Sequence, residues 1–201
     1  QKLLINSIGM KLIVIRHGQT NYNVKHWCNS RPNPKVRLTA LGRQQAKAAA
    51  EKLKAEKIEV VYISQLVRSQ QTALILNGYH HVPVIVDKRL NDRSVGCEDQ
   101  PVDIFYTWRD KQKNPWTGRF RDGESYEDMK KRIASFLKDL SKMDYKTVLI
   151  VTHLPILKAM RGYFKGLSNE QMDALSEAQV PNCRIMRFIL PSKTSKKFLK
   201  S

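Results

Sequence analysis

Two arginines and two histidines stand at places in the chain where side chains from separate segments often meet around a ligand. Arg16 and His17 end one apolar run, His153 ends a second, and Arg68 follows a third. Arginine gives forked hydrogen bonds to anionic oxygens, and imidazole can act as a nucleophile, a base or an acid. A lone histidine after a strand is more often a hydrogen-bonded loop residue. The hypothesis of a catalytic pocket therefore depends on all three junctions converging.

The three apolar runs have the composition of buried strands in a parallel sheet. Residues 12–15, 60–63 and 148–151 are short and rich in valine and isoleucine. In open α/β sheets, ligands bind in the crevice beyond the carboxyl ends of the strands. Gly18, directly after His17, allows the sharp turn and close backbone approach that such a crevice requires. We therefore expect one pocket at this edge of the sheet.

The rest of the chain predicts helices between these strands. Thr39 is a candidate N-cap for a helix through about residue 55, and Asn77-Gly78 closes another helix. Pro83 marks the segment 82–86 as an edge strand. Further helices are expected at 66–76, 101–113, 124–140 and from 154 to about 164, and a last strand at 184–190. Alternating strands and helices predict an α/β fold, a three-layer sandwich with a mostly parallel central sheet flanked by helices.

Four blocks of the sequence stand in an order that is typical of one family. Residues 16–23 are Arg-His-Gly-Gln-Thr-Asn-Tyr-Asn, and residues 38–42 are Leu-Thr-Ala-Leu-Gly. Residues 68–72, Arg-Ser-Gln-Gln-Thr, and the strand that leads to His153 follow them. In these blocks, residues 10–190 resemble the histidine phosphatase superfamily, the phosphoglycerate mutase-like proteins. The resemblance implies the fold of that family.

The resemblance also implies catalysis through a phosphohistidine. Family members use the histidine at the position of His17 as nucleophile, while Arg16 and Arg68 bind the phosphoryl oxygens. His153 would add a further hydrogen-bond donor. Because the arginines supply the positive charge, neither a metal ion nor another cofactor is expected. The substrate contacts expected from the same signature are Gly18, Thr20 and Asn23.

The chain departs from the family pattern at two positions near the expected pocket. Family members usually carry a glutamate as the acid where Asp92 stands, and aspartate shortens the reach by one methylene. An unperturbed aspartate titrates near ~3.9, so the pKa of Asp92 must be raised for it to donate a proton at neutral pH. Glu98 is the alternative acid. Leu154-Pro155 follows His153 where the family often has glycine, and proline is tolerated in a first helical turn.

The segment after the acid favours a phosphatase over a mutase. Cofactor-dependent mutases of the family carry a long insertion there, whereas only about thirty residues separate Asp92 from Gly123. We expect hydrolysis of a phosphomonoester on a small phosphorylated metabolite, with phosphoglycerate mutase activity as the alternative. Residues 95–98, 123–128 and 153–164 resemble the fructose-2,6-bisphosphatase branch, so a sugar bisphosphate such as fructose 2,6-bisphosphate is a candidate substrate.

A second anionic group on the substrate is expected from the segment 109–121. It contains five basic residues against one acid, Asp110, and Asn114-Pro115 predicts a loop able to fold over the pocket. Arg119 and Arg121 fall near positions that contact the sugar phosphate in the fructose-2,6-bisphosphatase branch. The alternative is that these cations only belong to a basic surface.

The overall charge suggests a rival function from another class. The chain has 36 Lys+Arg against 18 Asp+Glu, a formal net charge of +18, which attracts anions of every kind, nucleic acid included. Trp108, Trp116 and Phe120 alternate with basic residues, as stacking platforms for bases do. A nucleic-acid-binding protein on an inactive phosphatase fold is therefore the alternative. The intact set of two arginines and two histidines opposes it.

Length and composition predict one domain with a sizeable core, because the chain has 201 residues and is 41% hydrophobic. We expect the domain at 10–190, preceded at 1–9 by an extension or a cloning remnant and followed at 191–201 by a basic tail. No apolar run is long enough for a membrane span. Three cysteines without metal-like spacing predict reduced thiols in a cytoplasmic protein without a metal site; they are Cys28, Cys97 and Cys183. We expect a monomer or a homodimer.

Overall fold

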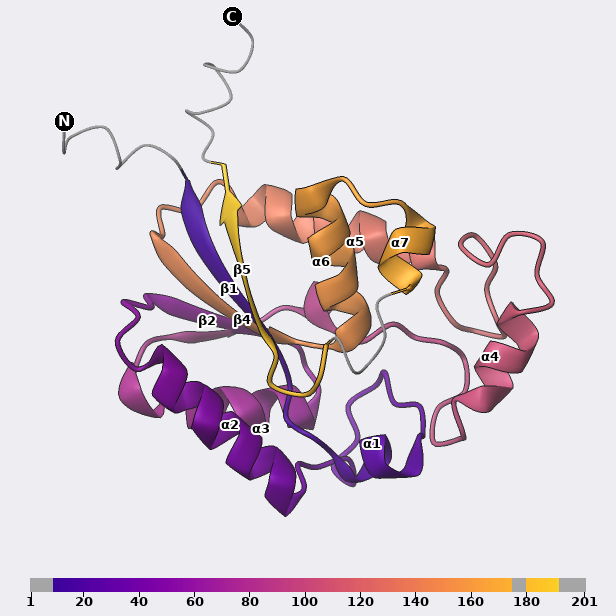
Figure 1. The fold of residues 1–201 in the computed structure, drawn as a ribbon, viewed down its shortest axis with the longest axis horizontal. Helices are drawn as coiled ribbons and strands as arrows, with labels where there is room; N and C mark the ends of the chain where they lie inside the picture. Colours follow the sequence, from indigo (N-terminus) through magenta and orange to yellow (C-terminus); the bar gives the residue numbers. More distant parts are fainter. Residues whose placement is uncertain (1–8, 175–179, 192–201) are drawn as a thin grey trace, which may run out of the picture.

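A five-stranded sheet lies between two layers of helices in the computed structural model, which describes residues 9–174 and 180–191 (Figure 1). The strands are β1 (Met10–Arg16), β2 (Val60–Ile63), β3 (Val84–Val86), β4 (Thr147–Thr152) and β5 (Ile185–Leu190). Their order is β3-β2-β4-β1-β5, and every neighbouring pair is parallel except β1–β5. The predicted fold class is therefore confirmed. Most of the predicted extension and tail lies outside the described residues.

The helices cover both faces of the sheet (Figure 1). One layer contains α2 (Ala40–Leu53) and α3 (Val67–Leu76), and the other contains α5 (Tyr126–Leu140), α6 (Leu154–Lys165) and α7 (Asn169–Asp173). The short helices α1 (Asn21–Lys25) and α4 (Asp103–Arg109) lie to the side, beyond the end of β1. Single turns of 3-10 helix occur at Asn77–Tyr79 and Lys88–Leu90. No helix in these parts of the chain is long and apolar enough to cross a membrane.

Two apolar clusters, one on each face, hold the sheet between its helices. Along β1, Leu12 and Val14 pack into the cluster of α5 and α6, whereas Ile13 and Ile15 pack into the cluster of α2 and α3. All four side chains are fully buried. Because successive side chains of a strand point to opposite faces, a strand covered on both faces must be apolar throughout. This explains why β1 has no alternating polar residues.

Local signals in the sequence account for the helix boundaries. The Thr39 hydroxyl accepts a hydrogen bond from Gly42 N at 3.0 Å and caps α2 as predicted. Pro155 occupies the first turn of α6, where its missing N–H costs nothing. The helix expected at 101–113 is shorter, spanning Asp103–Arg109, and turns follow it. The short helices α1 and α7 were not predicted; each begins with a capping box.

The carboxyl ends of β1, β2 and β4 meet at one edge of the sheet, because these strands are parallel. His17, Ser64 and His153 directly follow the three strands. The loop after β1 lies against the first turn of α2, so closely that a Cβ on Gly18 would come 2.4 Å from the carbonyl oxygen of Gly42. Glycine at this point therefore lets the helix hold the loop that carries His17.

Candidate active site

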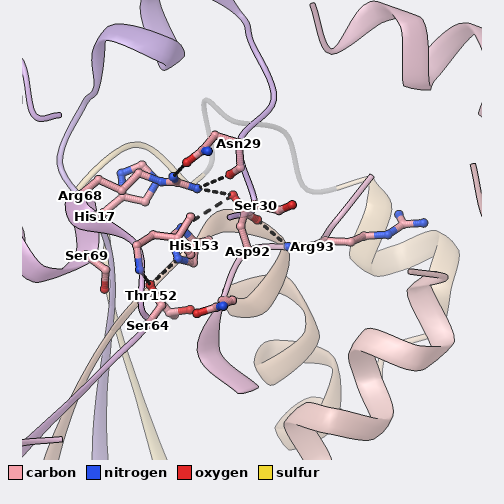
Figure 2. Close-up of polar contacts among 12 residues, drawn as sticks. His17, Asn29, Ser30, Ser64, Arg68, Ser69, Asp92, Arg93, Thr152 and His153 are labelled. Carbon is pink, nitrogen blue, oxygen red and sulfur yellow. Dashed lines mark hydrogen bonds and ion pairs between the residues drawn. The ribbon is translucent and has the colours of Figure 1, made fainter. Parts of the chain in front are cut away.

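The residues expected to hold an anion come together at this edge of the sheet (Figure 2). Arg16, His17, Arg68 and His153 are nearly or fully buried, and the two imidazole ring centres are 5.1 Å apart. Three of them, together with Asp92, line a cavity of about 410 Å³. Residues far apart in the sequence thus share one pocket, as the three strand ends predict.

The hydrogen bonds of His17 define its tautomer. Nδ1 lies 2.7 Å from the carbonyl oxygen of Gly18, which can only accept, so Nδ1 carries the hydrogen. Arg68 Nε donates to His17 Nε2 at 3.1 Å, so Nε2 presents its lone pair. Burial, and after it the charges of Arg68 and Arg16, hold the pKa of His17 well below 6.5. The imidazole is therefore neutral, with Nε2 available as a nucleophile.

Arg68 connects this histidine to two loops. Its Nη1 donates to Asn29 Oδ1 at 2.6 Å, and its Nη2 donates to the Asn29 carbonyl at 2.8 Å. Nη2 also forms an ion pair with Asp92 Oδ2 at 2.9 Å. Because a buried guanidinium must have its donors matched, these contacts fix Arg68 in the orientation that aims Nε at His17.

Asp92 has the environment that an acid requires. Its side chain is partly buried, and burial raises its pKa above 3.8 in spite of the neighbouring Arg68 charge. Oδ1 accepts from Arg93 N at 2.9 Å, and Oδ2 lies 3.7 Å from His153 Nδ1. The direction of this shift is the one that the predicted acid requires, and the role of Asp92 as the acid stays a prediction.

The Gly-Glu-Ser motif at 123–125 supports the backbone of the acid. Glu124 Oε2 accepts from Arg132 Nε at 3.0 Å, and Arg132 Nη2 in turn donates to the Asp92 carbonyl at 3.2 Å. Ser125 caps α5 by accepting from Asp128 N at 3.0 Å. The motif therefore starts a helix and fixes the acid at the same time.

His153 is held from behind by Ser64. Ser64 Oγ lies 2.8 Å from His153 Nε2 and accepts from Leu66 N at 3.3 Å, so its hydroxyl hydrogen is free to be donated to Nε2. In this tautomer Nδ1 carries the ring hydrogen, and this buried atom has no hydrogen-bond partner within the described part of the chain. Nδ1 lies 3.7 Å from Asp92 Oδ2, and His153 itself is not among the residues that line the cavity. His153 is also the N-cap of α6, where negative charge is favoured.

Glu98, the alternative acid, holds the loop at Ser30 by hydrogen bonds. Its two carboxylate oxygens each accept from Ser30 N at 3.0 Å, and it also accepts from the Ser30 hydroxyl. Asn29 Nδ2 lies 3.5 Å from the same carboxylate. Glu98 lines the cavity, but these bonds make it the anchor of the loop that carries Asn29.

The substrate contacts expected from the signature have different positions. Thr20 and Asn23 line the cavity, and together they form the capping box of α1. Gly18 is not in the cavity wall. Its N–H donates to Thr72 Oγ1 at 3.1 Å and its carbonyl accepts from His17, so it positions the histidine.

Arg119 and Arg121 are not among the residues that line the cavity. Arg119 is 62% exposed and forms an ion pair with Asp128 at 2.7 Å. Arg121 Nη1 donates to Gln100 Oε1 at 3.2 Å, and its guanidinium lies over the Phe120 ring. The structure thus does not bring these two arginines to the pocket, and their role in binding stays a prediction.

The aromatic residues considered as stacking platforms pack within the protein. Trp108 lies against Phe120 with ring centres 5.3 Å apart, and Trp116 meets Tyr126 edge-on at 5.4 Å. These contacts use ring surface that a nucleobase would need.

Several cavity residues were not predicted from the sequence, namely Asn29, Arg93 and Lys158, whereas Arg109 belongs to the basic segment 109–121 expected near the pocket. Lys158 stands four residues after Leu154 in α6, and both line the cavity. Helical spacing from Leu154, the residue directly after His153, could have indicated it. Asn29 lies in a loop without periodicity, and no sequence signal marks it. Across the described residues, no three histidine, cysteine or acidic side chains gather in a way that could hold a metal ion.

Arg16, His17, Arg68 and Asp92 line one cavity, and the buried His153 lies beside His17 and Asp92. Cationic, imidazole and carboxyl groups of this kind are the ones that phosphoryl transfer through histidine uses. Comparison with known proteins agrees with this class. The model of the histidine phosphatase superfamily (branch 1) matches residues 12–196. The chain therefore belongs to the histidine phosphatase superfamily and is an enzyme of that superfamily.

Individual relatives include both phosphatases and mutases. The chain is 30% identical to the 2,3-bisphosphoglycerate-dependent phosphoglycerate mutase of Bartonella quintana, over 82% of this chain and 86% of that protein. It is 29% identical to phosphoserine phosphatase 1 of Hydrogenobacter thermophilus, over 75% and 74%. It is 29% identical to the 6-phosphofructo-2-kinase/fructose-2,6-bisphosphatase of Gallus gallus, over 80% of this chain but 34% of that protein.

A similar solved structure is that of the alpha-ribazole phosphatase from Shigella flexneri. Its TM-score is 0.70 at 27% identity, and the match covers 81% of this chain and 83% of that one. The names of these relatives differ in substrate, so the comparisons give the superfamily and leave the substrate open.

Replacing Ser64 tests whether it orients His153. In Ser64→Ala, His153 Nε2 loses its partner, and an unsatisfied buried group costs about 1–3 kcal/mol of the free energy of unfolding. Because Nδ1–H is no longer fixed toward the pocket, we also expect weaker binding of vanadate or inorganic phosphate, measured by titration calorimetry.

The matched control is Ser69→Ala, which removes another buried serine hydroxyl, one that donates to the Val151 carbonyl at 2.7 Å. It should lose similar stability in a urea denaturation and keep its anion affinity. Equal weakening of anion binding in both variants would contradict the orienting role of Ser64.

Proposed function

We propose that this protein is a phosphomonoester hydrolase that forms a phosphohistidine at His17. The observation that carries the proposal is the state of that imidazole. Its Nδ1–H is committed to the Gly18 carbonyl, and its Nε2 lone pair faces the Arg68 guanidinium. His17 Nε2 is neutral and lies beside the fixed Arg68 guanidinium. It is therefore suited to attack the phosphorus of a phosphoryl group whose oxygens Arg68 binds.

The first step transfers the phosphoryl group. Arg16 and Arg68 bind its oxygens, and Arg68 Nε then donates to an oxygen in place of His17 Nε2. His17 Nε2 forms the bond to phosphorus while the bond to the leaving oxygen breaks. His153 Nδ1–H gives a further hydrogen bond to the phosphoryl group, and Asp92 donates its proton to the leaving oxygen.

The second step returns the enzyme to its starting state. Asp92, now ionised beside Arg68, takes a proton from a water molecule that attacks the phosphohistidine, and inorganic phosphate leaves with His17 neutral again. Asp92 is the better candidate for the acid than Glu98, because burial raises the pKa of Asp92 in spite of the Arg68 charge, whereas the carboxylate of Glu98 accepts hydrogen bonds from Ser30.

Hydrolysis rather than mutase activity is supported by the short connection after the acid. Between Asp92 and Gly123 the described chain forms one short helix, α4, and several of its residues line the cavity. A pocket of about 410 Å³ has room for a small phosphorylated metabolite and for water. Fructose 2,6-bisphosphate is a candidate substrate, and phosphoserine joins it because a relative is named for that activity. We place the enzyme among cytoplasmic, metal-independent phosphatases.

Trapping the intermediate tests covalent catalysis. Rapid quenching during turnover should leave a phosphoryl group on the protein that is acid-labile and base-stable, and His17→Asn should abolish both the label and turnover. The matched control is His81→Asn, which changes an exposed histidine and should keep both. Near-normal turnover in His17→Asn would refute the mechanism.

Leaving-group dependence tests the acid. Asp92→Asn should slow the hydrolysis of sugar phosphates by roughly 10²–10⁴-fold, and that of p-nitrophenyl phosphate far less, because p-nitrophenolate needs little protonation. Activity of the wild type on sugar phosphates should fall as the pH rises through the raised pKa of Asp92, since only the protonated form donates.

The same measurements on Glu98→Gln provide the comparison. We expect this variant to lose activity on both kinds of substrate alike, because it loosens the loop that holds Arg68. A selective loss on sugar phosphates in Glu98→Gln, with Asp92→Asn normal, would reassign the acid to Glu98.

A further inference from the structure

The cavity wall contains a further arginine, Arg93, directly after the acid, and its environment differs from that of Arg68. The Arg93 guanidinium carbon lies 5.0 Å from the centre of the Phe105 ring and 5.6 Å from that of Tyr126. All three residues line the cavity. Arg93 is thus a cation held between two aromatic faces at the edge of the pocket.

Most hydrogen-bond donors of Arg93 are unused. Its Nε donates to the Glu124 carbonyl at a long 3.4 Å, and its Nη2 is buried without a hydrogen-bond partner among the described residues. A guanidinium has five N–H donors, and aromatic faces compensate only part of the cost of burying them. Arg109, in the same wall, instead pairs with Asp110 at 2.9 Å and Asp173 at 3.4 Å.

We propose that Arg93 binds a second anionic group on the substrate, a carboxylate or a second phosphate, while His17 and Arg68 hold the phosphoryl group that is transferred. This inference rests on the proposed function and names its substrate class, phosphomonoesters whose other end is anionic. The planar fork of arginine matches both anions with paired hydrogen bonds. Burial lowers the pKa of Arg93, although the charges of Glu124 and Asp173 oppose that shift.

The direction of the Arg93 side chain indicates where the two ends of such a substrate would lie. Figure 2 shows Arg93 extending away from the cluster of His17, Arg68 and Asp92, although its backbone adjoins Asp92. A substrate that spans the two arginines therefore passes over the acid, which places its leaving oxygen near Asp92. Arg93 would thus bind the second anionic group that the sequence led us to expect at Arg119 and Arg121.

The test compares two ligands that differ only at the far end. 3-Phosphoglycerate ends in a carboxylate, and glycerol 3-phosphate ends in a hydroxymethyl group. Their dissociation constants are measured by calorimetry in a His17→Ala background, which prevents turnover. Arg93→Met keeps an apolar stem between the two rings, and we expect it to lower the preference for 3-phosphoglycerate by roughly ten- to a hundredfold.

Controls and further arms separate the alternatives. Arg187→Met removes an equal charge from an exposed site on β5 and should leave the preference unchanged. The same dissociation constants are measured for fructose 2,6-bisphosphate and fructose 6-phosphate, which differ by a second phosphate. The ligand pair whose preference falls more in Arg93→Met identifies which anion, carboxylate or phosphate, Arg93 binds.

An unchanged preference in Arg93→Met, equal weakening for both ligands, or the same loss in Arg119→Met would overturn the inference. The proposed function is tested separately: it fails if the unmodified enzyme releases no phosphate from phosphomonoesters.

Discussion

The contact between the Arg68 guanidinium and the His17 imidazole is the interaction on which the rest of the site depends. Burial is the largest cause of the lowered pKa of His17, and the positive charge of Arg68 opposes protonation of the imidazole further. The same cation would be costly at this depth if its donors were unmatched. Its contacts with Asn29 and Asp92 remove that cost, so the site is stable before a phosphoryl group arrives.

Segments that are distant in sequence fix the positions of Arg68 and of its partners. The loop that carries Asn29 is anchored by Glu98 through Ser30. The carbonyl of Asp92 is held by Arg132, which Glu124 orients in turn. Few of these supporting residues need to touch a substrate. They fix the directions of Arg68 and of the acid, and precise direction is what phosphoryl transfer requires from a protein.

Much of the fold could be predicted because its signals are local. The β-branched runs of β1, β2 and β4 are apolar throughout because helices cover both faces of the sheet, and Thr39 caps α2 through a contact three residues away. The strand ends also predicted the meeting of Arg16, His17, Arg68 and His153. Short helices such as α1 and α7 bury few side chains, so apolar periodicity could not indicate them.

The parts of the site that escaped prediction depend on contacts between loops. Arg68 donates from α3 to both the side chain and the backbone of Asn29, and the loop that carries Asn29 has no sequence pattern that indicates this contact. Arg93 was visible beside the acid, but its aromatic neighbours come from α4 and α5. Charge density instead drew attention to Arg119, whose partner Asp128 lies nine residues away on the surface.

The protonation state of His17 is the most direct measure of this account. Nitrogen NMR of the protein labelled with ¹⁵N-histidine distinguishes the two neutral tautomers from the imidazolium ion. We predict that His17 is neutral at pH 6, below the ordinary histidine pKa, with hydrogen on Nδ1 and a bare Nε2. An imidazolium signal for His17 at that pH, or hydrogen on Nε2, would contradict the central role assigned to Arg68.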